Sequence, residues 1–225
     1  MLRDHILVVV PAHNEAEHIS HVVLSAIQYL PVLVIDDGSD DNTALLAETS
    51  GAAVLQQFPN QGKGAALQSG FRQVLQEDWA AVITIDGDGQ HDPQDIPLFL
   101  RAYQQNQADL IIGARQFKDM PFTRRLGNTL GQALFSWAVR LPVPDNQSGF
   151  RLISRRMIEA MIENPIGGFE FEVEMVSQCI LHGYQLSWVP IHTIYAGQKS
   201  HIQPVRHVFR FLSLIWRTRR RTRIL

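Results

Sequence analysis

Five short apolar runs, four of them followed by a helical pattern, make up the first half of the chain. The runs lie at residues 6–10, 32–35, 53–55, 81–85 and 109–113, and the helical patterns lie at 15–29, 42–49, 64–76 and 95–105. Strands joined through helices of this length run parallel, and the helices cover the faces of the sheet. The alternation therefore predicts an α/β fold with a mostly parallel sheet and helices on both faces.

The alternation ends after residue 115. We expect a loop at 116–121, a helix at 124–140, a glycine-containing turn at 145–150, a helix at 170–181 and a strand at 186–190. The sequence shows neither an internal repeat nor a low-complexity linker. The length suits one domain over residues 1–192, followed by a tail at 193–225.

The tail carries a strong positive charge. No Asp or Glu follows Glu174, whereas one Lys and seven Arg do, so the net charge of -2 combines +8 after Glu174 with -10 before it. Apolar residues and arginines recur at helical intervals over 205–217, and a basic cluster follows at 219–223. Such an amphipathic basic helix suits the surface of an anionic membrane. Packing on the domain is the alternative, and we expect no nucleic-acid partner because no binding module is recognisable.

Two further features bear on location. No stretch reaches about 18 uninterrupted apolar residues, so we expect no membrane-spanning helix, and the run at 6–10 lacks the pattern of a signal peptide. Cys179 is the single cysteine, which excludes an internal disulfide and fits a reducing compartment. We therefore expect a cytoplasmic protein, peripheral on the cytoplasmic face of the membrane.

Polar residues follow four of the predicted strands at the point where each strand ends. Because the carboxyl ends of parallel strands share one edge of a sheet, these residues should line a common cleft. They are Pro11, His13 and Glu15 after the first strand, Asp36 and Asp37 after the second, Asp86, Asp88 and Gln90 after the fourth, and Arg115 after the fifth. A glycine-rich helix start at 60–70 adds Lys63, which could meet a phosphate, although the spacing is not that of a P-loop.

The turn after the fourth predicted strand carries two carboxylates, Asp86 and Asp88, and the amide oxygen of Gln90. Two carboxylates on one short turn can share a hard divalent cation, and an all-oxygen site suits Mg²⁺ or Mn²⁺. A lone D-x-D turn is also often a solvated acidic loop. The neighbouring polar clusters favour the metal site over that alternative.

Six motifs along the chain resemble, in order and spacing, those of the family 2 glycosyltransferases of GT-A fold. The motifs are PAHNE, IDDGSDDNT, NQGKGAA, IDGDGQHDP, GAR and DNQSGFR. As a set they are most similar to the dolichyl-phosphate mannose synthase and polyprenyl-phosphate glycosyltransferase branch. The resemblance covers about residues 6–190 and implies a Rossmann-like GT-A sheet, with a nucleotide-sugar half at 1–115 and an acceptor half at 116–192.

The resemblance also implies roles for the residues that match each motif. Those in the base- and ribose-binding motifs are Pro11, Glu15, Asp36 and Asp37, and those in the motif that holds a divalent cation on the diphosphate are Asp86, Asp88 and Gln90. The family usually places Tyr or Phe where His13 stands, although an imidazole can still stack on the base of a GDP- or UDP-sugar. Arg115, Asp145 and one of the pair Arg124 and Arg125 would lie near the acceptor.

The implied reaction is the inverting, metal-dependent transfer of a sugar to polyprenyl phosphate, either dolichyl or undecaprenyl. The cation would stabilise the negative charge that develops on the leaving diphosphate. A lipid phosphate is already ionised at neutral pH, so it needs cationic groups rather than a base. The guanidinium candidates are Arg115, Arg124, Arg125 and Arg151. A hydroxyl acceptor would instead need a base, for which Asp145, Glu170 and Glu172 are candidates.

Two other classes of function stay open on the sequence. A haloacid-dehalogenase-like phosphohydrolase also places a D-x-D turn after a strand, with Asp86 then acting as the nucleophile, but that pattern usually has Thr or Val where Gln90 stands. A non-catalytic module of the membrane surface is the second alternative. A membrane protein or a second copy of the chain is a further candidate partner.

Overall fold

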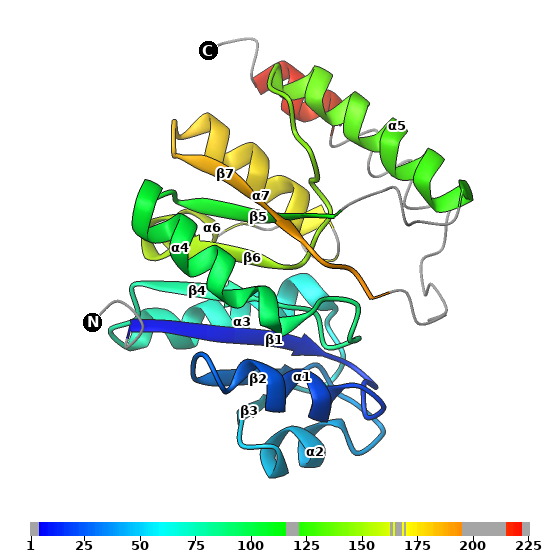
Figure 1. The fold of residues 1–225 in the computed structure, drawn as a ribbon, viewed down its shortest axis with the longest axis vertical. Helices are drawn as coiled ribbons and strands as arrows, with labels where there is room; N and C mark the ends of the chain where they lie inside the picture. The colour runs from blue at the N-terminus through cyan, green and yellow to red at the C-terminus, as the bar shows by residue number, and fades with distance from the viewer. Residues whose placement is uncertain are drawn as a thin grey trace.

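A single sheet forms the centre of the computed structural model, which describes residues 5–115, 122–162, 164, 168, 170–194 and 215–221, and of residues 122–128 the backbone alone. Its seven strands are β1 (Ile6–Ala12), β2 (Val32–Asp36), β3 (Ala53–Gln56), β4 (Ala81–Thr84), β5 (Leu110–Arg115), β6 (Arg151–Ser154) and β7 (Leu186–Ile191). Across the sheet they follow the order β3-β2-β1-β4-β6-β5-β7 (Figure 1).

The sheet is parallel except at β6. β1 pairs in parallel with β2 and β4, β2 with β3, and β5 with β7. β6 runs antiparallel between β4 and β5, with Arg151 opposite Thr84 on one side and Ile112 on the other. The mostly parallel sheet is confirmed, and its one reversed strand comes from the part of the chain where the alternation of strands and helices ends.

Helices cover both faces of the sheet (Figure 1). They are α1 (Ile19–Ala26), α2 (Thr43–Thr49), α3 (Lys63–Gln76), α4 (Ile96–Asn106), α5 (Phe122–Val139), α6 (Arg155–Met161) and α7 (Glu170–Leu181). α1, α2 and α4 pack on one face, and α3, α5, α6 and α7 pack on the other. Along β1, Val8 and Val10 belong to the first cluster and Leu7 and Val9 to the second, as the two-residue period of a strand requires. The inner strands β1, β2, β4 and β6 are buried on both sides, which explains their continuous apolar sequences, whereas the edge strand β3 is partly exposed.

α1 is shorter than the helix expected at 15–29. The residues before Ile19 form a turn whose backbone is held by one side chain from the β2–α2 connection and one from the first residue of α2. The N–H of Glu15 donates to Thr43 Oγ1 at 2.8 Å, and that of Ala16 donates to Asp41 Oδ2 at 3.2 Å. These tertiary bonds keep Glu15 in a loop at the end of β1, and helical periodicity carries no sign of them.

The structure adds α6, which the sequence reasoning missed. The side chain of Ser154 accepts a hydrogen bond from Met157 N at 3.2 Å and so caps the start of this helix. Met157, Ile158 and Met161 are buried against the second core cluster. The serine followed by this apolar spacing is the signal that could have found it.

A last helical segment, residues 215–221, packs against α5 and α7. Its Thr218 hydroxyl shares a hydrogen bond with Ser177 at 3.1 Å, and Arg221 pairs with Glu174 at 2.8 Å. The loop expected at 116–121 lies outside the described residues, and so do residues 205–214 of the helix expected at 205–217. The described helical segment ends at Arg221, four residues beyond the expected end. Within the described ranges, no helix has the length and apolar character needed to cross a membrane.

Candidate active site

Two buried carboxylates, Asp36 and Asp37, stand at the end of β2. Asp37 accepts hydrogen bonds from the backbone N–H groups of Gln61 and Gly62, at 2.8 and 2.7 Å. A carboxylate that holds two successive backbone amides fixes the loop that carries them. Asp37 therefore sets the position of Lys63, the first residue of α3.

The end of β1 contributes a third carboxyl group to this edge of the sheet. Pro11 is buried and His13 is exposed. Burial raises the pKa of Glu15, and the carboxylates of Asp88 and Asp86 raise it further, to about 7. Negative charge is thus concentrated between the end of β1 and the turn after β4.

Lys63 forms an ionic bridge between two carboxylates. Its Nζ lies 2.6 Å from Asp86 Oδ1 and 3.0 Å from Glu172 Oε2. Burial opposes the charge of Lys63, but Asp86 and Glu172 outweigh it and raise the pKa of the ammonium. Burial likewise opposes ionisation of Asp86, but the charge of Lys63 outweighs it, so the pKa of Asp86 is lowered. Lys63 and Asp86 are therefore both charged at neutral pH.

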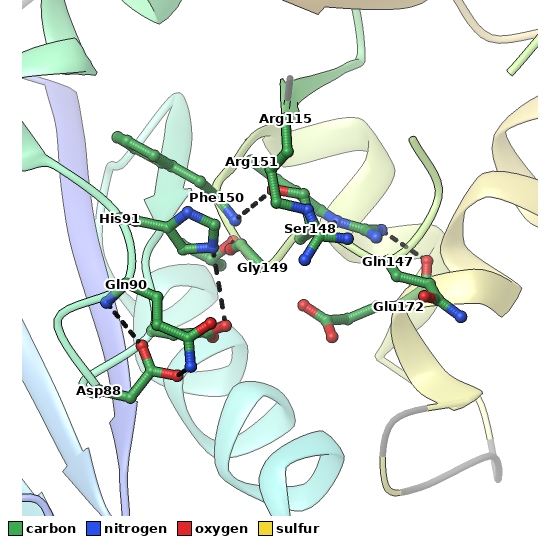
Figure 2. Close-up of polar contacts among 12 residues, drawn as sticks. Asp88, Gln90, His91, Arg115, Gln147, Ser148, Gly149, Phe150, Arg151 and Glu172 are labelled. Carbon is green, nitrogen blue, oxygen red and sulfur yellow. Dashed lines mark hydrogen bonds and ion pairs between the residues drawn. The ribbon is translucent and has the colours of Figure 1, made fainter. Parts of the chain in front are cut away.

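Asp88 faces Gln90 within the turn after β4, which also carries Asp86 (Figure 2). Its Oδ1 accepts from Gln90 N at 3.0 Å and its Oδ2 from Gln90 Nε2 at 2.9 Å. Burial raises the pKa of Asp88, and the nearby charge of Asp86 raises it further. Among the described residues, no three or more His, Cys, Asp or Glu side chains gather into a group that could hold a metal ion.

Gly149 presses against the Asp86 carboxylate. A Cβ added at this glycine would lie 2.6 Å from Asp86 Cγ and closer still to both carboxylate oxygens. The carbonyl of Gly149 accepts a hydrogen bond from Thr84 Oγ1 at 2.9 Å. The loop at 145–150 is thus joined directly to the end of β4, and only a glycine fits at the point of contact.

His91 is a site residue to which the sequence reasoning gave no role. Its ring is 4% exposed, with its centroid 5.7 Å from that of Phe150 and its Nε2 3.8 Å from Asp86 Oδ2 (Figure 2). Burial lowers the pKa of His91 to about 4, so the ring is neutral near pH 7. Its place directly after the D-x-D-x-Q motif was the only sequence signal.

Arg115 and Asp145 form an ion pair with two hydrogen bonds. Arg115 Nε lies 2.7 Å from Asp145 Oδ2, and Nη2 lies 3.1 Å from Oδ1. Asp145 is 2% exposed, and its carbonyl accepts from Trp188 Nε1 at 3.2 Å. The pair links the end of β5 to the loop at 145–150, so the structure brings together two residues that were expected near the acceptor.

Arg151, the first residue of β6, is wholly buried. Its Nε donates to the carbonyl of Ser148 at 2.7 Å and its Nη2 to that of Asn146 at 3.0 Å, while Nη1 donates to the carbonyl of Glu172 (Figure 2). This burial argues against the expected phosphate clamp, because a clamp needs a guanidinium that a ligand can reach. Arg151 instead holds the loop at 145–150 against the start of α7.

The remaining candidates separate into different places. The side chains of Arg124 and Arg125 lie outside what the structure describes. Glu172 and Glu174 are both buried, but Glu172 faces Lys63 and Glu174 pairs with Arg221 of the last helix. Of these two carboxylates, only Glu172 reaches the cluster around Lys63 and Asp86.

Several curated proteins are similar to this chain over most of its length. An uncharacterized protein of Methanocaldococcus jannaschii, MJ1222, is 34% identical over 86% of this chain and 83% of its own. The polyprenol monophosphomannose synthase of Mycolicibacterium smegmatis is 27% identical, over 82% of this chain and 76% of its own. The undecaprenyl-phosphate mannosyltransferase of Micrococcus luteus is 28% identical, over 83% of this chain and 82% of its own.

The fold is shared with solved structures and the sequence with a defined family. A crystal structure of glucosyl-3-phosphoglycerate synthase from Mycobacterium tuberculosis, in complex with Mn²⁺, uridine diphosphate and glucosyl-3-phosphoglycerate, matches with a TM-score of 0.73 at 21% identity and covers 95% of this chain and 77% of that one. The sequence model of glycosyl transferase family 2 matches residues 7–162. The chain therefore belongs to glycosyl transferase family 2, and it is a glycosyltransferase of GT-A fold similar to the polyprenyl-phosphate sugar transferases.

Proposed function

We propose that the protein transfers a sugar from a nucleotide-sugar to a polyprenyl phosphate, with inversion and with Mg²⁺ or Mn²⁺. A phosphate oxygen of the lipid attacks the anomeric carbon, the bond from that carbon to the diphosphate oxygen breaks, and the nucleoside diphosphate leaves. A single displacement from the opposite face inverts the anomeric centre. The observation that carries the proposal is the arrangement of charge at the strand ends, where Asp86 and Asp88 lie beside the cationic groups of Lys63 and Arg115.

The turn after β4 suits a hard divalent cation. The pKa values of Glu15 and Asp88 are raised by burial and by neighbouring carboxylates, so an added cation would stabilise their ionised forms. Mg²⁺ commonly takes one or two carboxylates and completes its shell with substrate phosphates and water. When bound, the cation would stabilise the charge on the leaving diphosphate. We assign Asp86, Asp88 and Gln90 as its protein ligands.

We place the nucleotide in residues 1–115, along the ends of β1 and β2. The exposed ring of His13 is available to stack on the base, in line with Pro11 and Glu15 on the same loop. Asp36 and Asp37 shape the second loop of this site. Lys63 stands where its ammonium can meet the diphosphate. This assignment accepts either a GDP- or a UDP-sugar.

We place the acceptor in residues 116–192, with Arg115, Asp145 and Arg125 near its phosphate. The names of the relatives from M. smegmatis and M. luteus support a polyprenyl phosphate. Two of the three carboxylates that could have served as the base for a hydroxyl acceptor are engaged, Asp145 by Arg115 and Glu172 by Lys63. An ionised phosphate needs no base, so this pairing favours the lipid phosphate.

The surface of α5 and the last helix suits a membrane. Leu130 and Trp137, seven residues apart on α5, are 60% and 58% exposed, and Trp216 is 59% exposed. The guanidinium of Arg219 lies 4.7 Å from the Trp137 ring centroid, and that of Arg220 lies 4.3 Å from that of Trp216. Exposed aromatic rings beside arginines favour the headgroup region of anionic lipid. We therefore propose that the tail, 193–225, brings the enzyme to the cytoplasmic face of a membrane as a peripheral protein.

The test is sugar transfer by the purified protein. Radiolabelled GDP- and UDP-hexoses are incubated with dolichyl or undecaprenyl phosphate and Mn²⁺, and label in the lipid extract is counted. We expect label only when both the lipid phosphate and the cation are present, and an inverted anomeric centre in the NMR spectrum of the product. Asp88→Asn should lower the rate about 100-fold, as removal of an electrostatic stabiliser does. Transfer that is indifferent to EDTA or to this substitution would contradict the metal site.

The two other classes of function gain no support. A phosphohydrolase would need Asp86 as a free nucleophile, whereas Lys63 holds it at 2.6 Å and the family is one of glycosyltransferases. The same family membership makes the chain an enzyme rather than a binding module. Trapping of a phosphorylated Asp86 would overturn this conclusion.

A further inference from the structure

An ammonium group already stands beside one of the carboxylates assigned to the cation. Lys63 Nζ is 2.6 Å from Asp86 Oδ1, and the two side chains are 17% and 23% exposed. At such distances in a partly buried site, like charges repel by several kcal/mol or more. A divalent cation that binds Asp86 therefore competes with Lys63 for its charge, most directly at the Oδ1 atom.

Glu172 offers the displaced ammonium a second carboxylate. Its Oε2 lies 3.0 Å from the same Nζ, and its side chain is 4% exposed. The carbonyl of Glu172 accepts a hydrogen bond from the buried guanidinium of Arg151, which fixes the start of α7. Glu172 is thus a rigidly placed negative group, too buried to be a ligand of a solvent-borne substrate.

The base of the Lys63 side chain is fixed as well. Asp37 holds the N–H groups of Gln61 and Gly62, directly before Lys63. Only the flexible part of the side chain can move, so the ammonium can shift between Asp86 and Glu172 without leaving the cleft.

We propose that Lys63 is a built-in counterion of the D-x-D turn, which neutralises Asp86 until a divalent cation binds there, and that Glu172 is the positioning residue that then keeps the ammonium in the site. The inference rests on the proposed function, because it requires a cation at Asp86 and Asp88. It explains why a buried carboxylate from α7 is joined to the donor side of the cleft. Once Asp86 binds the cation, the ammonium of Lys63 stays in the site and can interact with the diphosphate.

The experiment measures Mn²⁺ binding to the whole protein, without nucleotide, by calorimetry and by EPR of the free ion. The double variant Lys63→Met/Glu172→Gln is decisive, because it removes one charge of each sign and preserves the net charge of the site. If Lys63 competes for Asp86, this variant binds Mn²⁺ about tenfold more tightly than the wild type, since no ion pair has to be broken. Equal affinity of the two proteins would overturn the proposal.

A double-mutant cycle tests the positioning role of Glu172. Glu172→Gln should weaken Mn²⁺ binding when Lys63 is present, because the ammonium then has only Asp86 as a partner, and Glu172→Asp should restore part of the affinity. The effect should be much smaller in the Lys63→Met background. An equal effect in both backgrounds would show that Glu172 acts on the cation directly, against the proposal. Lys63→Met alone removes the ammonium from two carboxylates, and this variant can unfold. In that case the Mn²⁺ affinities of the double variant and of Glu172→Gln still test the proposal.

Asp88→Asn separates this inference from the proposed function. If Asp88→Asn leaves Mn²⁺ binding unchanged, the cation lies elsewhere and both proposals fail. If it weakens binding while the double variant behaves as the wild type, the metal site stands and the counterion role of Lys63 fails alone.

Discussion

A methyl group at Gly149 would enter the space of the Asp86 carboxylate. The Cβ of an alanine would lie 2.6 Å from Asp86 Cγ and closer still to both carboxylate oxygens. Because both oxygens are approached equally, rotation of the carboxylate does not clear the overlap. Either Asp86 moves away from Lys63, or the loop at 145–150 moves away from β4. The φ angle of Gly149 lies outside the left-handed region, so backbone strain adds nothing to this clash.

The size of the effect follows from the shift required. An ordinary contact needs at least 3.4 Å, so the 2.6 Å approach has to open by nearly 1 Å. Overpacking of this kind costs about 1–3 kcal/mol, and alanine regains about 0.4–1 kcal/mol by restricting the unfolded chain. We expect Gly149→Ala to lower the free energy of unfolding by about 1–2 kcal/mol. A displacement of about 1 Å in a catalytic group lowers the rate about 100-fold.

Urea unfolding and the rate of sugar transfer measure the two effects. Gly87→Ala is the matched control in the turn after β4, because its Cβ would meet Ala12 Cβ and Pro11 O at an ordinary 3.4 Å. This control should unfold and react much as the wild type does. If Gly149→Ala and Gly87→Ala behave alike in both assays, the steric reasoning is refuted.

Three other features predict measurable changes. His91 has its pKa lowered by burial to about 4, against 6.5 when unfolded, so its contribution to stability is complete above pH 6.5 and is lost as the pH falls toward 4. The full contribution of His91 to the free energy of unfolding is about 3 kcal/mol. The free energy of unfolding in urea should therefore depend less on pH in His91→Gln than in the wild type, and an unchanged pH dependence would contradict the lowered pKa of His91. Arg151→Met leaves three carbonyls without their buried donor and should lower the free energy of unfolding by about 3 kcal/mol or more. The KM for the lipid phosphate should not rise selectively. A selective rise would show that Arg151 acts as a phosphate clamp. Trp137→Ser with Trp216→Ser should weaken sedimentation with phosphatidylglycerol vesicles about tenfold, and unaltered sedimentation would disprove the membrane surface.

Local sequence carried much of the candidate site. Asp36 and Asp86 directly follow apolar runs, Asp88 comes two residues after Asp86, and a parallel sheet necessarily brings such strand ends to one edge. The cationic group at Lys63 was likewise visible as a glycine-rich helix start. The start of α1 was misjudged because Thr43 and Asp41 hold the preceding turn through side-chain bonds, which leave no trace in a periodic pattern.

The sequence by itself determined the α/β class, the polar strand ends and the family, because each depends on short-range periodicity or on motifs in order. Only the tertiary structure decided which charges meet. Lys63 and Glu172 are 109 residues apart, and their ion pair exists because α3 and α7 pack on the same face of the sheet. The reversed strand β6 places Arg151 inside the protein, where its guanidinium donates to three backbone carbonyls. Burial and pairing are properties of the packed state, so residue type and spacing could not separate a clamp from a structural arginine.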